Sequence, residues 1–90
     1  MSYQLHPEVK WSEVLGDHSL LDKRTGEYFD LNTTGAIIFT SLLTSKSDNE
    51  AIAKVAKALH TSMNSVEASF LSFREVLLGR KILIQMKLEE

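Results

Sequence analysis

The sequence predicts an α+β domain in which a three-stranded antiparallel sheet precedes three helices. Short stretches of alternating apolar and polar residues, separated by turn residues, occupy positions 9–31. Apolar residues at helical spacing then continue to about residue 79, and polar residues suited to helix capping interrupt them twice. Strands that are grouped ahead of helices in this way are typical of the α+β class.

Three strands are expected in the first third of the chain. Val9 and Trp11 alternate with polar neighbours and indicate a strand that ends near residue 15. Ser19–Asp22 forms a second, and Glu27–Leu31 a third that is rich in aromatic residues. Gly26 suits the left-handed position of the turn before the third strand. Because the connections are short, neighbouring strands should be antiparallel, with the second strand in the centre.

Helices are expected over three segments after Leu31. The first runs from about Thr33 to Leu43, and Asn32 can cap its first turn. Ser47 and Glu50 have the spacing of a capping box, in which each satisfies the other's helix-start amide. The third helix should open near Asn64 and continue to about residue 78.

The third helix carries an unusually wide apolar arc. At about 100° per residue one stripe faces a single direction, and further apolar residues lie on either side of it. The stripe consists of Val66, Phe70, Phe73 and Leu77, with Leu71 and Leu78 to one side and Val76 to the other. This arc is too wide for one neighbouring helix. We therefore expect part of it to face the sheet and to leave a groove beside the third strand.

The C-terminal tail contains a second strand-forming segment. Residues 82–88 are mostly apolar and alternate imperfectly, which predicts a further strand. The chain of 90 residues should therefore be one winged-helix-like domain, with its core at about 7–83 and a tail at 84–90. The tail could pair with a sheet edge of its own or a neighbouring chain, which would give a homodimer through an edge strand or tail.

Composition excludes several classes of function. The formal net charge of -2 argues against a dedicated nucleic-acid binder. There is no cysteine, no apolar run of roughly 20 residues that could cross a membrane, and no recognisable signal peptide. We therefore expect a cytoplasmic protein that is not embedded in a membrane.

Catalytic and metal-binding patterns are also missing. Asp17, His18 and Ser19 are consecutive, so their side chains cannot assemble as a catalytic triad. The three histidines lack the spacing of a metal site, and no glycine-rich phosphate loop is present. No enzymatic activity, metal or cofactor is predicted.

The third strand is the feature that points to a function. As the last strand of a meander it should be a sheet edge with unpaired backbone groups, which can capture an extended peptide. Successive side chains on a strand face opposite sides. We expect Phe29 and Leu31 to face the core, with Tyr28 and Asp30 facing away.

A specific run of residues resembles the PqqD-like fold. The run is Gly26 followed by Tyr28-Phe29 and Leu31-Asn32-Thr33-Thr34-Gly35. Pro7 ahead of the first strand, Leu42-Leu43 and the stripe from Val66 through Phe73 to Leu77, ending near Ile82-Leu83, fit the same pattern. The resemblance extends from about Pro7 to Leu83, with departures at Phe39, Ser69 and Lys81.

The resemblance implies a non-catalytic adaptor. PqqD-like domains are leader-recognition elements for ribosomally made, post-translationally modified peptides. They bind the leader of a precursor as an added strand and present the remainder to a modifying enzyme. A free-standing chain of this size is most similar to the recognition proteins of lasso-peptide clusters, which work beside a separate leader peptidase. Chaperones of radical SAM enzymes in PqqD-type pathways are an alternative.

The predicted peptide-binding residues come from the third strand and the third helix. They are Glu27, Tyr28, Phe29, Asp30, Leu31, Phe70, Phe73, Arg74 and Leu77. Arg74 interrupts the apolar arc, so it either pairs with an acidic leader residue, pairs with Glu67 or is solvated. The aromatic residues of the helix are either a pocket floor or ordinary core residues.

Two other functions stay open. A helix-turn-helix across residues 60–64 would suit DNA, but the third helix offers only Arg74 as a cation, with Glu67 and Glu75 opposing phosphate. A module that binds a partner without leader specificity is the second alternative.

Overall fold

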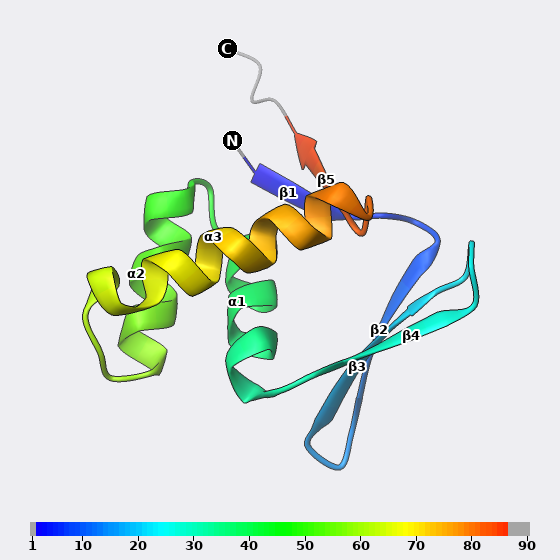
Figure 1. Ribbon diagram of the computed structural model, residues 1–90, viewed down its shortest axis with the longest axis horizontal. Coiled ribbons are helices and arrows are strands. Elements are labelled where there is room, and N and C mark those ends of the chain that lie inside the picture. Colours follow the sequence, from blue (N-terminus) through cyan, green and yellow to red (C-terminus); the bar gives the residue numbers. More distant parts are fainter. Residues whose placement is uncertain (1, 87–90) are drawn as a thin grey trace.

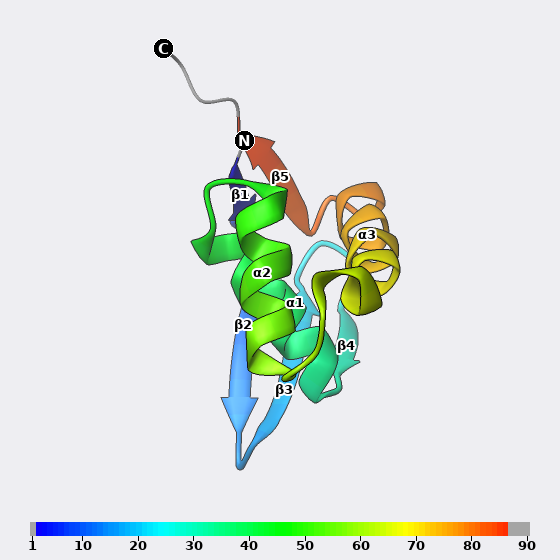
Figure 2. The same ribbon diagram turned by 90° about the vertical axis from the view of Figure 1, so that its left-hand side faces the viewer.

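The computed structural model describes residues 2–86 and contains two small sheets and three helices. The strands are β1 (Ser2–Leu5), β2 (Val9–Val14), β3 (Asp17–Asp22), β4 (Glu27–Leu31) and β5 (Leu83–Met86). The helices are α1 (Thr33–Thr44), α2 (Asp48–Ala58) and α3 (Met63–Gly79). Figures 1 and 2 show the β2–β3–β4 sheet extending away from the helices, with the β1–β5 ribbon near the opposite end.

The three-stranded sheet is the predicted meander. β3 is central and pairs antiparallel with both neighbours, in a register that places Leu20 opposite Phe29 and Trp11. Gly26 has a φ of 77°, so the tight turn before β4 uses the left-handed conformation that glycine adopts without a steric penalty. The winged-helix-like α+β class predicted from the sequence is confirmed.

The inner face of this sheet packs onto the helices. Leu20 is fully buried, and Phe29 and Leu31 pack against the core while Tyr28 is 69% exposed. Trp11 lies parallel to the Phe39 ring of α1, with a centroid separation of 4.8 Å. Offset aromatic pairs add about 1 kcal/mol to the burial of their surfaces. The expected orientation of β4, with Phe29 and Leu31 inward, is therefore confirmed.

The β1–β5 ribbon differs from the expected arrangement of the ends. β5 lies within the predicted 82–88 segment, but its partner is β1, a strand that the sequence analysis did not predict. Tyr3 of β1 and Leu83 of β5 are both buried in the core. Among residues 2–86 the tail therefore does not cover the edge of β4, and Leu88 lies outside the described residues.

The helix caps correct two details of the prediction. α3 begins after Ser62, whose side chain accepts the Ser65 amide, rather than at Asn64. Ser47 caps α2 by accepting the Glu50 amide, as expected. The Glu50 carboxylate, however, accepts the amide of Lys46 at 2.7 Å instead of closing a box with Ser47. The amide that Glu50 binds is thus one residue earlier in the chain than the Ser47 amide that a capping box requires.

Candidate functional site

The exposed edge of β4 is the centre of the candidate site. Within residues 2–86 β4 pairs with β3 alone, so its other side has no strand partner. In antiparallel pairing alternate residues direct their backbone N–H and C=O to the same side. Alternate residues from Glu27 to Leu31 thus offer backbone donors and acceptors away from β3. The resulting edge can accept one extended peptide.

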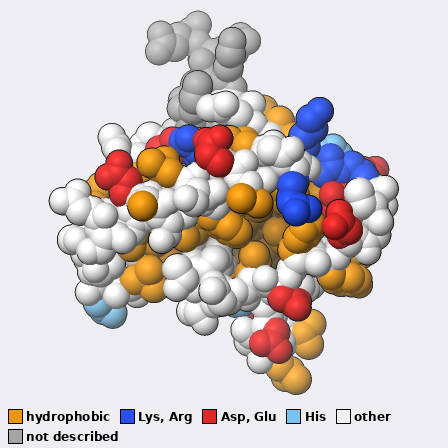
Figure 3. Space-filling model, viewed as in Figure 1, with side chains coloured by type: hydrophobic (Ala, Val, Ile, Leu, Met, Phe, Trp, Pro, Cys, Tyr) orange, Lys and Arg blue, Asp and Glu red, His pale blue; other side chains and the backbone are white. Residues whose placement is uncertain are grey.

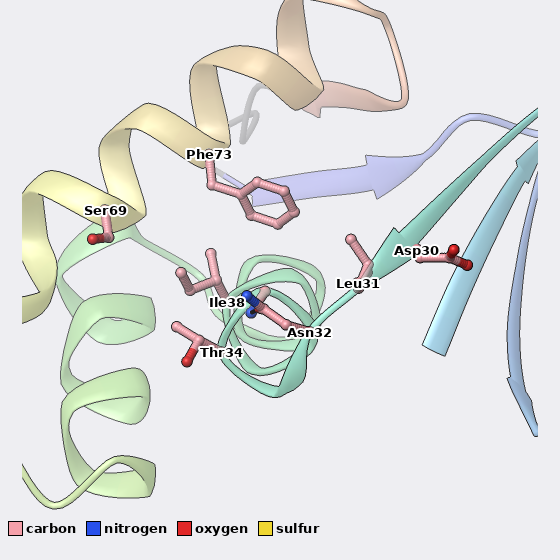
Figure 4. A pocket seen from close by; sticks show the side chains of 8 residues that line it. Asp30, Leu31, Asn32, Thr34, Ile38, Ser69 and Phe73 are labelled. Carbon is pink, nitrogen blue, oxygen red and sulfur yellow. Dashed lines mark hydrogen bonds between the residues drawn. The ribbon is translucent and has the colours of Figure 1, made fainter. Parts of the chain in front are cut away.

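A hollow lies between the end of β4, the start of α1 and the middle of α3. Its volume is about 350 Å³, and its lining residues are Asp30, Leu31, Asn32, Thr34, Gly35, Ile38, Ser69 and Phe73. Figure 4 shows Phe73 reaching from α3 toward Leu31 and Ile38. In Figure 3 hydrophobic side chains gather in this central region. We call this hollow the β4–α3 groove.

The groove is formed by local structure that the sequence specifies well. Asn32 caps α1, and its Oδ1 accepts the Gly35 amide at 2.7 Å. A Cβ at position 35 would lie 3.1 Å from that Oδ1, so glycine there keeps the strand-to-helix junction compact. Apolar Leu31, Ile38 and Phe73 form its walls, and the polar side chains of Asn32, Thr34 and Ser69 lie at its margin. The hollow can therefore take an apolar side chain from a peptide beside β4.

A second, smaller hollow lies next to the first. It has a volume of about 280 Å³ and is lined by Asp17, His18, Asp30 and Leu31, two of which also line the first hollow. His18 packs near the Trp11 ring, with centroids 5.3 Å apart. The carboxylates of Asp17 and Asp30 make this end of β4 acidic.

The predicted residues of α3 divide into two groups. Phe70 is 0% exposed and Leu77 is 2% exposed, so both belong to the core and not to the floor of the groove. Phe73 is only partly buried and lines the hollow. The packed part of the arc is narrower than predicted, because Val76 on its flank is 52% exposed. Which part of the arc becomes core depends on how α2 and β5 pack against α3. That information is not local to the helix.

Arg74 lies in an ion-pair network inside the chain. Its guanidinium binds the carboxylate of Asp48 on α2 and that of Glu75, and its side chain is 21% exposed. The hydrogen bond that Arg74 donates to the Glu75 carboxylate, together with the charge of Asp48, raises the pKa of Arg74 above its ordinary value. Tyr3 donates to the other Asp48 oxygen at 2.8 Å. This network links β1, α2 and α3. The partners of Arg74 are therefore Asp48 and Glu75, and not Glu67 or solvent alone.

Two arginines outside the predicted set of site residues shape the other end of β4, and Arg24, whose place in the turn favoured a solvated side chain, is instead bound to the protein. Arg24 binds both oxygens of Asp22, at 2.9 and 3.0 Å, and donates to the carbonyls of Arg80 and Lys81. The same guanidinium holds the pKa of the Asp22 carboxyl below its ordinary value. Arg80 extends over the Phe29 ring, with its Cζ 5.0 Å from the centroid. The signal available in the sequence was the position of Arg24 in the turn and of Arg80 just after the helix.

No group of three or more histidine and carboxylate side chains among residues 2–86 could hold a metal ion. The helices within that range are too short or too polar to span a bilayer.

Fold and groove together define a class: a small α+β domain with one sheet edge exposed beside a helix. The chain belongs to the PqqD family, because the family model for coenzyme PQQ synthesis protein D matches residues 17–83. No curated protein matches the chain in sequence.

Two solved structures share the fold. One is TbiB1 in complex with the TbiA(beta) leader peptide, with 22% identity, a TM-score of 0.78 and coverage of 97% of this chain and 99% of that chain. The other is a lasso peptide synthetase B1 complexed with the leader peptide, with 27% identity, a TM-score of 0.75 and coverage of 94% and 100%. Both match nearly the entire length of either chain, so they share its complete architecture.

Proposed function

We propose that this protein is a non-catalytic adaptor that binds the leader of a precursor peptide. The leader adds as a strand to the exposed edge of β4, and an apolar leader side chain enters the β4–α3 groove. The observation that carries the proposal is the edge of β4, which pairs with no other strand on that side within residues 2–86 and lies beside a hollow lined by Leu31, Ile38 and Phe73. Strand addition takes affinity from backbone hydrogen bonds and specificity from alternate side chains.

The pathway follows from the comparison with lasso peptide synthetase B1. That protein is complexed with a leader peptide and matches 94% of this chain at 27% identity. We assign the present chain to the same kind of step: it holds the leader in the cytoplasm while a separate leader peptidase or modifying enzyme acts on the precursor. Delivery of a peptide to a radical SAM enzyme is the second candidate, and membership of the PqqD family favours it.

The proposed binding surface differs from the predicted one on the helical side. It keeps Glu27–Leu31 for backbone pairing and Phe73 for the groove, and it adds Asn32, Ile38 and Ser69. Phe70, Leu77 and Arg74 support this surface through the core and the network with Asp48 rather than contacting the peptide.

An N-methyl scan tests the mode of binding. The probe is a fluorescent synthetic leader, taken from the precursor encoded beside the gene, and each of its amides is methylated in turn. A peptide that pairs with β4 directs alternate N–H groups at the strand. Methylation at alternate positions should therefore weaken binding by about tenfold or more, and methylation between them should have little effect. Uniformly small effects would exclude strand addition.

A further inference from the structure

The end of β4 near Glu27 carries a cation whose binding capacity is largely unused. Arg80 is the C-cap residue of α3, at the start of the turn that leads to β5, and its side chain is 51% exposed. Its closest carboxylate within residues 2–86 is that of Glu27, at 3.9 Å, and both groups are half exposed. Pairs of this kind contribute less than about 1 kcal/mol. The guanidinium, which has five N–H donors, therefore retains donors for a ligand.

The other two arginines of the chain are not available in this way. Arg24 makes a bidentate pair with Asp22 and also holds two backbone carbonyls. Arg74 is bound to Asp48 and Glu75. Among the three arginines of the sequence, Arg80 thus has the longest ion pair in the described structure, 3.9 Å to Glu27.

Arg80 is also held in position. The carbonyls of Arg80 and Lys81 accept hydrogen bonds from Arg24 at 3.1 and 3.3 Å, which fasten the end of α3 to the turn before β4. The guanidinium itself lies over the Phe29 ring at 5.0 Å, a cation–π contact that favours one orientation. Phe29 faces the same side of the sheet as Leu31, which lines the hollow. Arg80 therefore faces the same side as the β4–α3 groove.

The spacing of residues along β4 gives the separation between the hollow and Arg80. A strand rises about 3.3 Å per residue, so Leu31 and Glu27 lie about 13 Å apart along β4. A peptide strand of about five residues spans both the hollow and Arg80. Its side chains on the groove side recur every second residue.

We propose that Arg80 is a specificity residue that reads an acidic side chain of the bound peptide. This inference rests on the proposed function and adds the chemistry of the ligand. The peptide should carry an Asp or Glu two or four residues from the apolar side chain that enters the hollow. Its carboxylate replaces the distant contact with Glu27 by a bidentate pair, the geometry in which guanidinium binds carboxylate best. Arg24 is a positioning residue for this contact.

The two ends of β4 carry side chains of opposite charge. Arg24, Arg80 and Lys81 gather at the end of β4 that begins with Glu27, whereas Asp17 and Asp30 lie at the opposite end. In Figure 3 Lys and Arg side chains cluster at one end of the hydrophobic region. An acidic peptide residue is attracted to the first end and repelled from the second, so its position fixes the register of the added strand.

The test uses a random library of displayed 12-residue peptides. Peptides selected against the wild-type protein should share an apolar residue and an acid two or four positions away. Arg80→Glu should bind a selected peptide about tenfold more weakly, and replacing the peptide's acid with Lys should restore most of the affinity. Lys57→Glu makes the same reversal of charge at an exposed position of α2, away from β4, so it serves as the matched control and should have a much smaller effect.

The outcomes separate the two proposals. Peptides that bind along β4, shown by amide shifts at residues 27–31, but carry no acid preference would overturn the role of Arg80 and leave the proposed function standing. Recovery of no peptide that binds along β4 would overturn both. Thermal unfolding of each variant checks that the fold is retained. Recovery of affinity when Arg80→Glu is combined with the Lys-substituted peptide requires direct contact between the two side chains, so a merely structural role of Arg80 would not produce it.

Discussion

Two phenylalanines one helical turn apart should respond very differently to truncation. Phe70 is fully buried, whereas Phe73 is partly exposed and forms a wall of the groove. Phe70→Ala should cost about 3–5 kcal/mol, since it removes a complete core side chain and leaves a cavity. Phe73→Ala should cost about 1 kcal/mol, since only part of its surface leaves water on folding. The difference is a direct measure of which face of α3 is the core.

The expected shifts in melting temperature follow from the size of the domain. For about 90 residues, 1 kcal/mol corresponds to roughly 5 °C. Phe73→Ala should therefore melt about 5 °C below the wild type, and Phe70→Ala at least about 15 °C below. Trp11, the single tryptophan, stacks on Phe39 in the core, so its fluorescence reports unfolding.

Peptide binding completes this comparison. Phe73→Ala should weaken binding of the leader by about tenfold or more, although the variant is nearly as stable as the wild type. Phe70→Leu, a milder change that keeps the core filled, should leave binding almost unchanged below its melting temperature. Equal losses of stability for the two alanine variants would refute the assignment of Phe70 to the core and Phe73 to the groove.

Three further predictions concern the framework of the site. Asn32→Ala should lower the free energy of unfolding by about 1 kcal/mol in urea titrations, because α1 loses its cap; an unchanged midpoint would rule out that role. Tyr3→Phe should cost about 1 kcal/mol by removing the hydrogen bond to Asp48, and a neutral result would mean that water replaces it fully. Arg24 lowers the pKa of Asp22, so the pair stabilises the fold above about pH 4, and this contribution is lost as the pH falls through the lowered pKa. Asp22→Asn should therefore be less stable than the wild type at pH 7 and differ less from it at pH 2; an equal difference at both values would refute the linkage.

Local signals predicted β4 and the start of α1 well. Gly26 at a left-handed turn, the alternation through Phe29 and the cap at Asn32 each depend on neighbours within a few residues. Such features are fixed by backbone geometry that a short segment already contains.

The missed features depend on contacts between distant parts of the chain. β1 is four residues long and gains its partner β5 from the other end of the sequence. The partner of Arg74 is Asp48, 26 residues away, and Arg24 meets the carbonyl of Arg80 across 56 residues. No periodicity within α3 could indicate that Phe70 would be covered and Phe73 left at the surface. Packing of the other elements decides that.

Chemical-shift mapping of the labelled protein with its precursor leader tests the central claim most directly. The account predicts that the backbone amides of Glu27–Leu31 shift and gain protection from exchange, together with Ser69 and Phe73 on α3. If the changes instead gather on α2 or on the β1–β5 ribbon while β4 is unaffected, the leader does not bind by pairing with this strand.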